Sequence, residues 1–569
     1  MADFIIKNAT FEKIVKFNKM RGKYSSEIFW DVVVLSALDC DQKNAFEMQI
    51  KEKIERKELP LSPTYHVMHD PVGVKVGNGG AVIAIIDELN QIYGEKLETL
   101  KVIIFLSGGY SQRLPSASAL GKIFTALPFG DPIYQMIEVK LALFVDFPKR
   151  MNAGIFVASS DCFELYHLDG DEWNFTREGV TALAHCSPIE VGLTHGVYVL
   201  DDLKSSQLLE SNSTTTKMSG CKRFLHKPSK ELMRSQGAVF INDSKEYIYS
   251  DSAYYMDNNT AKLLLNWYKM HGPLACEIDA YGDFLQSLGS AATSDYCRDV
   301  KNVTVVLDEL EKTRLEIFNV LKGTPLNIIL LDKSKFYHIG TTQEYIYHFC
   351  IDNAFREELS CLNHVMLKTD SGVLGDRSKQ HILIHSYIPD LSCIGNCVIV
   401  EYSILNADNK IGDNCIISNC SFPNGACVPS NTFLHTIPLS DSGKVYYVTL
   451  VFDVTDDLKT SVTSFETGHL QFCGKTLKEL VFLLHINEQH IWPETCPSRN
   501  LWNAKIYPAY SDPAQSLQAA IDIKTNLLCP NFSVFTYGGV LYSISDVLKK
   551  KNLCCMLDMR AKLRDLIEK

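Results

Sequence analysis

The chain has 569 residues, of which 46% are hydrophobic and 22% are charged, a composition typical of a globular protein with two or three domains. Its formal net charge of −11 argues against a nucleic-acid backbone as the partner, although a local group of cations could still bind a small anion. The first residues lack a signal-peptide pattern, and no window has the ~18 uninterrupted apolar residues of a membrane helix, so we expect a cytoplasmic protein.

The 18 cysteines are scattered along the chain and lie mostly within apolar runs. Their spacing does not match that of a zinc site, and a cytosolic chain keeps its thiols reduced. We therefore expect free cysteines in the core.

Buried strands and amphipathic helices alternate over the first 300 residues. Strands are expected at 31–38, 101–109 and 153–161, and helices from about Ala81 and over 132–147. This alternation predicts a Rossmann-like α/β domain, whose mostly parallel sheet is covered on both faces. In such sheets, ligands bind at the carboxyl ends of the strands.

A glycine-rich and cationic segment, "FLSGGYSQRLPSASALGK", follows the second of these strands at 105–122. Gly108 and Gly109 carry no Cβ, so phosphate oxygens could approach their backbone N–H groups. Arg113 and Lys122 are cations suited to a polyphosphate. The pattern alone also fits an ordinary turn followed by solvated charges, and it is neither a Walker sequence nor a dinucleotide fingerprint.

A second glycine cluster, "VGNGGAV", directly precedes the helix expected from Ala81. The free N–H groups of a helix start favour an anionic ligand. The alternative for Gly77, Asn78, Gly79 and Gly80 is a tight turn without a binding role.

A repeat of 17 residues marks a second region. Ile394, Ile411 and Val428 occupy equivalent positions, and a repeat too short to bury its own apolar face must stack on its neighbours. This predicts a left-handed parallel β-helix, with an irregular β-sandwich as the alternative. The predicted domains are 1–345 (catalytic), 346–440 (β-helix) and 441–569, an α+β extension that caps the solenoid or mediates self-association.

The glycine-rich segment resembles the signature of sugar-1-phosphate nucleotidyltransferases. The surrounding residues, together with "FLHKPS" (224–229), "YSDSAYYMD" (249–257), "CEIDAYGDFLQSLG" (276–289) and "KFYHIGTTQEY" (335–345), resemble the branch that acts on fucose 1-phosphate. The resemblance implies a GT-A-like domain and transfer of GMP from GTP to L-fucose 1-phosphate, giving GDP-L-fucose and pyrophosphate. It also implies in-line attack on the α-phosphorus, with positioning and charge neutralisation as the source of rate.

The resemblance also implies roles for individual residues. Arg113 and Lys122 would hold the triphosphate and stabilise the leaving pyrophosphate, and Lys227 would steer the sugar phosphate. The other residues implied are those of a base, ribose and phosphate pocket (Ala37, Gly77, Asn78, Gly79, Gly80, Gly108, Gly109 and Ser111) and two that touch the sugar (Asp251 and Ser252).

Metal binding is expected to depend on Asp161, which ends a predicted strand and matches the family's metal aspartate. Mg²⁺ or Mn²⁺ would suit a carboxylate beside phosphate oxygens. The sequence departs from the family at two positions, Cys162 and His338. For His338 we favour a structural role. Asp279 and Asp283 could substitute as ligands if they share a helical face.

Two other functions are compatible with these residues. The chain could make GDP-mannose or a UDP-sugar, or it could be a degenerate transferase that binds a nucleotide sugar without turnover. The four residues Arg113, Lys122, Asp161 and Lys227 favour an enzyme. An NAD-linked enzyme is disfavoured because neither glycine cluster has the required spacing.

Overall fold

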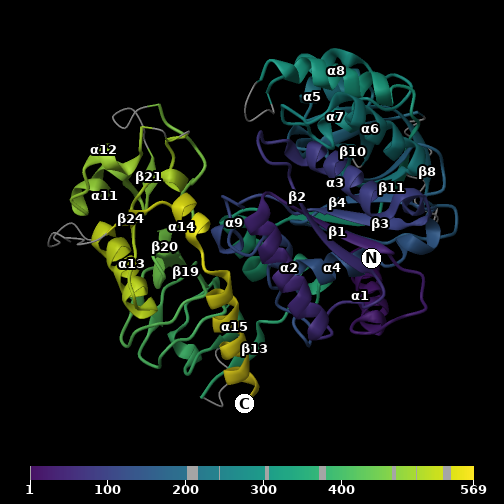
Figure 1. The fold of residues 1–569 in the computed structure, drawn as a ribbon. Helices are drawn as coiled ribbons and strands as arrows, with labels where there is room; N and C mark the ends of the chain where they lie inside the picture. Colours follow the sequence, from purple (N-terminus) through teal and green to yellow (C-terminus); the bar gives the residue numbers. More distant parts are fainter. Residues whose placement is uncertain are drawn as a thin grey trace. The chain divides into compact units, whose positions relative to one another are not determined.

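The computed structural model describes residues 2–201, 216–242, 244–301, 307–370, 380–463, 470–494, 496, 498–528 and 540–569 (Figure 1). The chain divides into two compact units, one made of residues 1–109 and 137–337 and the other of residues 110–136 and 338–569. We describe each unit by itself. The three domains expected from the sequence stay a prediction.

The first unit is built on a mixed sheet. Its strand order is β2 (Thr64–His69), β1 (Val32–Ala37), β3 (Lys101–Leu106), β4 (Gly154–Ser159), β10 (Lys245–Asp257), β6 (Val180–Pro188), β11 (Leu326–Leu331), β8 (Met218–His226) and β7 (Gly196–Leu200). The strands from β2 to β4 are parallel to one another, as predicted. β10 is antiparallel to both of its neighbours, β4 and β6, so the other half of the sheet is mixed.

Helices cover both faces of this sheet, as the alternating pattern predicts (Figure 1). On one face lie α3 (Gly77–Tyr93), α6 (Asn258–His271) and α8 (Glu309–Leu321), whose apolar side chains share a core with the sheet. Figure 1 shows α2 (Cys40–Glu55) and α4 (Met136–Leu143) on the other side. Smaller elements of the first unit are α1 (Ala2–Met20), β5 (Cys162–Tyr166), α5 (Lys230–Ser235), β9 (Phe240–Asn242), α7 (Gly282–Leu285) and β12 (Ser334–His338).

The three strands expected from the sequence are present, but two helix boundaries differ from the prediction. α3 begins at Gly77, four residues before Ala81, so the glycine cluster forms its first turn. α4 begins only at Met136, because the residues before it pair with another segment, with the Leu127 N–H donating to the Tyr134 carbonyl at 2.9 Å.

The second unit contains a ladder of short strands. Its sheet order is β13 (His364–Lys368), β14 (His381–Tyr387), β15 (Val398–Glu401), β17 (Ile416–Ser418), β19 (Thr432–Asp441) and β20 (Lys444–Asp453), parallel from β13 to β19. Ile399 lies opposite Ile416, and Ile416 opposite Phe433. A second pair, β16 (Lys410–Ile411) and β18 (Cys427–Val428), places Ile411 opposite Val428. The 17-residue register predicted from the repeat is confirmed.

Bends between the stacked strands recur with the same period. Cys397, Asn414 and Asn431 all have left-handed backbone conformations, with φ of 54°, 58° and 58°, and asparagine tolerates this conformation better than most residues. The Asn414 side chain donates to the Asn431 side chain at 2.7 Å. Each unit of the repeat therefore turns at an equivalent position and hydrogen-bonds the next.

The chain after the ladder closes it and then packs against it. β19 and β20 form an antiparallel hairpin from Thr432 to Asp453, and α13 (Pro513–Leu528) packs on β20. The remaining elements of the second unit are α9 (Thr342–Ile346), α10 (Asn353–Glu358), β21 (Gln471–Phe472), β22 (Lys475–Thr476), α11 (Leu477–Leu483), α12 (Glu488–Ile491), β23 (Tyr507–Pro508) and β24 (Leu541–Tyr542).

The amphipathic pattern of residues 544–569 predicts one terminal helix, and this prediction is wrong. Two helices, α14 (Ile544–Lys550) and α15 (Leu553–Glu568), are separated at Asn552, whose side chain accepts from the Cys555 N–H at 2.9 Å and caps the second helix. α15 packs on β13 and β14, and its Arg560 guanidinium lies 3.7 Å from the centre of the Tyr402 ring.

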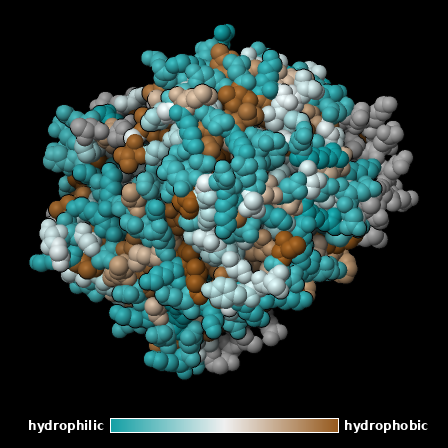
Figure 2. All heavy atoms as spheres, turned by 45° about the vertical axis from the view of Figure 1, so that its right-hand side comes forward, coloured by the Kyte–Doolittle hydropathy of each residue, from teal (hydrophilic) through white to brown (hydrophobic). Residues whose placement is uncertain are grey.

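The face of the molecule in Figure 2 is mostly hydrophilic, with apolar side chains in small separate groups. In the part of the chain that the structure describes, no helix is both long and apolar enough to cross a bilayer.

The stacked strands predict a large penalty for a charge at Ile411, which is 4% exposed. Ile411→Asp would bury an unpaired carboxylate between coils and should destabilise the fold by about 3 kcal/mol or more. Thermal unfolding followed by circular dichroism would measure this loss. The neighbouring exposed Lys410 supplies the control, since Lys410→Asp should leave the melting temperature nearly unchanged. Equal melting temperatures for Ile411→Asp and the wild type would show that this face is not buried.

Candidate functional site

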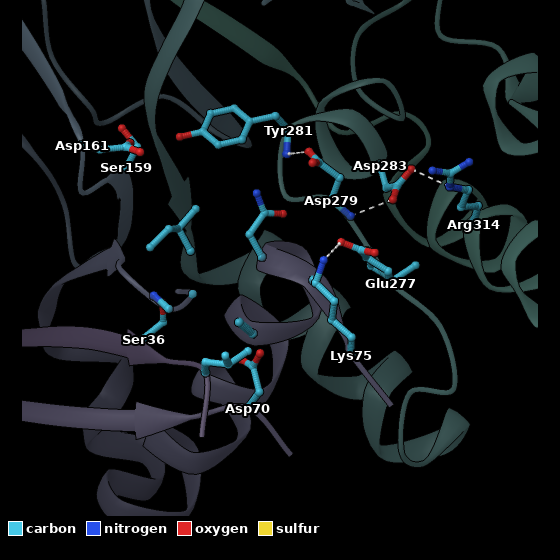
Figure 3. A pocket seen from close by; sticks show the side chains of 18 residues that line it. Ser36, Asp70, Lys75, Ser159, Asp161, Glu277, Asp279, Tyr281, Asp283 and Arg314 are labelled. Atoms are coloured by element: carbon cyan, nitrogen blue, oxygen red, sulfur yellow. Dashed lines mark hydrogen bonds and ion pairs between the residues drawn. The ribbon is translucent and has the colours of Figure 1, made fainter. Parts of the chain in front are cut away.

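A cavity of about 400 Å³ lies in the first unit at the carboxyl ends of β1, β3 and β4 (Figure 3). Residues at or just beyond the ends of these strands line it, together with residues from the start of α3 and from the segment before α7: Ser36, Leu38, Gly108, Gly109, Ser159, Asp161, Gly77, Asn78, Asp279 and Tyr281. In Figure 3 the Tyr281 ring extends from its side of the cavity toward Asp161. The edge of the sheet predicted to hold the ligand therefore holds a cavity.

Side chains from β1 and α2 fix the glycine turn after β3. Ser36 Oγ accepts from the N–H groups of Ser107 at 2.9 Å and Gly108 at 3.2 Å. Gln42 accepts from the Gly109 N–H at 3.2 Å and donates to the Gly109 carbonyl at 2.9 Å. The expectation that both N–H groups are open to phosphate is thus corrected, because both already have partners within the protein.

Gly108 allows a close approach of two backbone segments, whereas Gly109 supplies a positive φ. A Cβ on Gly108 would lie 3.1 Å from the Ala37 carbonyl carbon, whereas one on Gly109, where φ is +125°, would meet nothing within 4 Å. Ala37 itself is fully buried, and its carbonyl accepts from the Asp70 N–H at 2.9 Å. Its neighbours Ser36 and Leu38, rather than Ala37, line the cavity.

The second glycine cluster brings the start of α3 against residues 278–280. A Cβ on Gly77 would lie 2.5 Å from the Ile278 carbonyl oxygen, and one on Gly79 would lie 2.8 Å from the Asp279 carbonyl carbon. Asn78 accepts from the Ala280 N–H at 2.8 Å. Gly77 and Asn78 line the cavity, while Gly80 packs against Val76 and Leu274 behind it. The first turn of α3 therefore forms the cavity wall, where a helix N-terminus favours an anion.

Asp279 and Asp283 do not share a helical face, because Asp279 lies before α7. Its carboxylate accepts from the N–H groups of Tyr281 and Gly282, at 2.8 and 2.6 Å. The Asp283 side chain is 2% exposed and pairs with the Arg314 guanidinium at 2.8 Å. Burial raises the pKa of Asp283 to about 7 although Arg314 opposes the shift. Asp283 is therefore engaged in a structural pair, which corrects the suggestion that it could substitute as a metal ligand.

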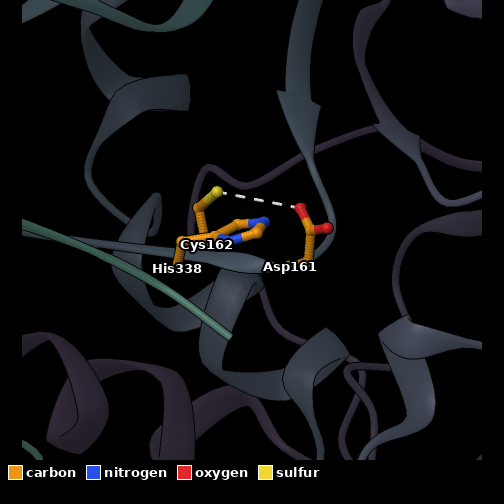
Figure 4. Close-up of side chains that lie close together, drawn as sticks. All are labelled: Asp161, Cys162 and His338. Carbon is orange, nitrogen blue, oxygen red and sulfur yellow. Dashed lines mark hydrogen bonds between the residues drawn. The ribbon is translucent and has the colours of Figure 1, made fainter. Parts of the chain in front are cut away.

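Asp161 lies at the cavity wall directly before Cys162 (Figure 4). The Cys162 thiol donates to its carboxylate, with 3.7 Å between sulfur and oxygen. Burial, together with the negative charge of Asp161, raises the pKa of Cys162 well above its usual value, so this sulfur stays a neutral thiol. A neutral thiol is a poor ligand, which leaves the Asp161 carboxylate as the donor suited to a hard cation.

A second group of charged residues surrounds Asp251 on β10. Its carboxylate accepts from the Gly196 N–H at 2.9 Å. Burial raises the pKa of Asp251 to about 7, Asp279 adds to the rise, and Lys227 opposes it. His226, beside the exposed Lys227, has its pKa lowered by burial while Asp279 opposes the shift. Two predicted residues, Asp251 and Lys227, therefore influence each other electrostatically. Asp279 acts on the same carboxyl group and also lines the cavity.

Ser252 faces a different environment. It is 6% exposed, and its hydroxyl lies 3.4 Å from Glu164, which forms a buried ion pair with Lys140 on α4. Lys140 also donates to the Cys162 carbonyl at 3.1 Å. Ser252 thus belongs to the buried support beneath Asp161, and its predicted contact with a sugar stays a prediction.

Three predicted residues belong to the second unit. Ser111 is buried and has φ of +50°, Arg113 is exposed, and Lys122 is half-buried at the start of a short 3₁₀ turn. Because Lys227 lies in the first unit, the convergence of the three cations on one ligand stays a prediction. In the second unit, His338 hydrogen-bonds Glu344 at 3.0 Å, and Glu344 also caps α9; the structural role of His338 stays a prediction.

Sequence reasoning missed Ser36, Gln42 and Tyr281. Ser36 and Gln42 flank the end of β1, and this position at the carboxyl end of a predicted strand was the available signal. Tyr281 lies in a segment whose approach to α3 depends on contacts distant in sequence, so no local pattern marks it.

Comparison with known proteins gives a consistent match. The fucose pyrophosphorylase domain family matches residues 94–512. A fucose-1-phosphate guanylyltransferase from Mus musculus is 40% identical over 98% of this chain and 96% of that protein. The one from Homo sapiens is also 40% identical, over 98% of this chain and 94% of that protein. A solved UDP-glucose pyrophosphorylase complexed with UDP-glucose covers 62% of this chain and 85% of its own, at 9% identity and a TM-score of 0.23.

The close packing at Gly77 predicts that even a methyl group will disturb this wall. Gly77→Ala combines a positive φ of +73° with a 2.5 Å approach to the Ile278 carbonyl, and it should cost about 1–3 kcal/mol of stability. Gly237→Ala is the matched control, since Gly237 has φ of +70° but nothing within 4 Å of its Cβ position. Thermal melts of both variants would measure the difference. Equal losses would mean that backbone strain, and not the contact with Ile278, is responsible.

Proposed function

The chain belongs to the fucose pyrophosphorylase family, and from this we propose that it transfers GMP from GTP to L-fucose 1-phosphate, giving GDP-L-fucose and pyrophosphate. The observation that carries the proposal is the 40% identity to fucose-1-phosphate guanylyltransferases over 98% of the chain. The cavity at the carboxyl ends of β1, β3 and β4 is the region of the first unit where a nucleotide would bind.

The reaction forms one bond and breaks one bond at the same phosphorus. An oxygen of the fucose phosphate attacks the α-phosphorus of GTP, and the bond between that phosphorus and the pyrophosphate oxygen breaks on the opposite side. No covalent intermediate with the protein is needed. The protein must hold the two phosphates in line and neutralise the charge of the departing pyrophosphate.

The nucleotide would occupy the cavity against the first turn of α3. Gly77 and Asn78 offer backbone there, and the helix dipole favours negative charge. Ser36 and Gln42 would act as positioning residues, because they hold the Gly108–Gly109 turn through the hydrogen bonds described above. Ala37, Gly79 and Gly80 would support these residues from behind.

The sugar phosphate would bind toward Asp251 and Lys227. The Asp251 carboxylate would accept hydrogen bonds from sugar hydroxyls, and the Lys227 ammonium would steer the phosphate toward the nucleotide. Their mutual electrostatic influence supports this pairing, since the positive charge of Lys227 opposes the burial-driven rise in the pKa of Asp251. Asp279, which affects the same carboxyl group, would connect the sugar to the cavity.

Asp161 would hold a divalent cation, Mg²⁺ or Mn²⁺. Its carboxylate lines the cavity and suits a hard cation, whereas the neighbouring thiol stays neutral. When bound, the cation would neutralise charge on the phosphates. Lys140 would act as a positioning residue because it fixes the Cys162 carbonyl next to Asp161.

Arg113 and Lys122 would bind the triphosphate and stabilise the leaving pyrophosphate. The exposure of the Arg113 side chain in the second unit supports this role, since the guanidinium is accessible to a ligand.

We also propose a cytoplasmic location and a left-handed coil for the stacked strands of the second unit. A coil is supported by the 17-residue register and by bends that recur at the same position in each unit.

The direct test is pyrophosphate release by the purified protein with GTP, Mg²⁺ and L-fucose 1-phosphate. Replacing GTP with UTP, or fucose 1-phosphate with mannose 1-phosphate, tests the substrate assignment. Release only with GTP and fucose 1-phosphate is the expected result. Faster release with UTP or mannose 1-phosphate would reassign the substrate, and no release at high enzyme concentration would indicate a nucleotide-sugar-binding regulator.

The role of Lys122 predicts a specific kinetic defect. Lys122→Ala should lower turnover by roughly 100-fold or more, because a preorganised donor to the leaving group is lost. Steady-state kinetics would measure this, with Lys410→Ala as a control that removes an exposed lysine from the same unit. Unchanged turnover in a folded Lys122→Ala protein would remove this residue from the mechanism.

The raised pKa of Asp251 predicts a pH-dependent affinity for the sugar phosphate. Because this pKa is about 7, the group is a carboxyl at pH 6 and a carboxylate at pH 8. If the carboxylate accepts from sugar hydroxyls, KM for fucose 1-phosphate should fall as pH rises through 7.

Asp251→Asn isolates this effect. The substrate phosphate titrates near pH 6 and contributes equally to both proteins, so the difference between their two KM profiles reports Asp251. Parallel profiles across this range would contradict the assigned role.

A further inference from the structure

A second cavity in the first unit, of about 290 Å³, is lined by residues distant from the nucleotide site in the topology. Its wall comes from α1, from the segment 146–150 that precedes β4, and from the end of β5. The nucleotide cavity lies at the opposite, carboxyl end of β4. This size is at the lower end of the range for small-molecule sites, about 300 Å³.

Lys13 on α1 is the buried charge of this cavity. It is 6% exposed, and in the described part of the chain its ammonium forms one side-chain hydrogen bond, to the Tyr166 carbonyl at 2.6 Å, and no ion pair. The same nitrogen lies 3.3 Å from the centre of the Tyr166 ring. Burial, together with the neighbouring Lys16, lowers the pKa of Lys13 to about 7, while Asp146 and Glu12 oppose the shift. An ammonium has three donors, so most of its capacity is unused.

Three more cations lie at the rim of the cavity. Lys16 pairs with Asp146 at 2.8 Å, and Lys149 pairs with Glu27 at 2.8 Å. Arg150 lies over the Trp173 ring, 4.2 Å from its centre, and pairs with the fully exposed Asp171. Exposed ion pairs contribute little and exchange readily with solvent, so these cations can turn to a stronger anion.

The charges that line the cavity fit a dianion. Lys13, Lys16, Lys149 and Arg150 line the cavity together with two carboxylates, Glu12 and Asp146, while the partners of Lys149 and Arg150 do not belong to its wall. Phosphate groups carry between one and a half and two negative charges near pH 7. A lysine retained only for packing would be expected to have a carboxylate partner or to reach solvent, and Lys13 does neither.

We propose that this cavity is a binding site for a phosphate group, either inorganic phosphate or a small phosphate monoester, with Lys13 at its base and Lys16, Lys149 and Arg150 at its rim. The site is separate from the nucleotide cavity and does not depend on the function proposed above. β5 connects the two cavities. It begins at Cys162, beside Asp161, and ends at Tyr166, whose carbonyl accepts from Lys13.

Equilibrium dialysis with radiolabelled inorganic phosphate tests the proposal. The full-length protein would be dialysed without divalent cation and with excess GTP to occupy the first cavity, with chloride holding ionic strength constant. One phosphate per chain is expected to remain bound. Lys13→Met should weaken this binding roughly tenfold or more, since a charge-assisted partner is lost.

Two other variants separate binding from folding. Lys16→Gln alters an exposed side chain, so it should weaken phosphate binding without lowering the melting temperature. Lys262→Met removes one exposed lysine of the same unit that pairs with Glu98, and it should bind phosphate like the wild type. Phosphate binding that disappears in GTP, or that is equal in wild type and Lys13→Met, would overturn the proposal.

Proton uptake is an independent readout. A bound dianion should raise the pKa of Lys13, so binding at pH 7.5 should take up protons, measured by calorimetry in buffers of different ionisation enthalpy. The titratable and charged groups that face Lys13 are Glu12, Lys16, Asp146, Lys149, Arg150 and His167. Uptake that persists in Lys13→Met would contradict its assigned place in the site.

Competition by glycerol 3-phosphate identifies the form of the ligand. Displacement of labelled phosphate would show that the site accepts a monoester, and no displacement would assign it to inorganic phosphate.

Discussion

The cavity at the carboxyl ends of β1, β3 and β4 depends on the absence of side chains where α3 begins. The backbone of residues 278–280 passes so close to Gly77 and Gly79 that a single methyl group on either would overlap it. This approach lets Asn78 bond the Ala280 N–H, which in turn sets where Asp279 and Tyr281 emerge into the cavity. A steric constraint on two glycines thus determines where a carboxylate and an aromatic ring can meet a ligand.

The proposed mechanism divides its charges between the two units. Carboxylates and the start of a helix lie in the first unit, while Arg113 and Lys122 lie on a segment that leaves it directly after Gly109. An acidic protein that binds a triphosphate must supply cations locally, because its net field repels anions. The family match covers residues 94–512 and so includes both the turn and the cations.

Much of this fold was predictable from the sequence because its signals are local. The buried strands, the helices between them and the 17-residue register follow from apolar periodicity, which each segment carries by itself. The engaged N–H groups of Gly108 and Gly109 could not be predicted, since their partners, Ser36 and Gln42, come from another strand and helix. The Asp283–Arg314 pair was missed for the same reason, and the break at Asn552 because amphipathic periodicity continues across it.

The hairpin of β19 and β20 has a consequence for assembly. A stack of parallel coils would present unpaired N–H and C=O groups at its last rung, and such an edge recruits further strands from other molecules. Here the last rung is paired by an antiparallel strand of the same chain, and α13 packs on that strand. The sheet edge therefore passes to β20, where Tyr447 exchanges backbone hydrogen bonds with Tyr510, so a coil from another molecule would meet an antiparallel strand rather than a further parallel rung.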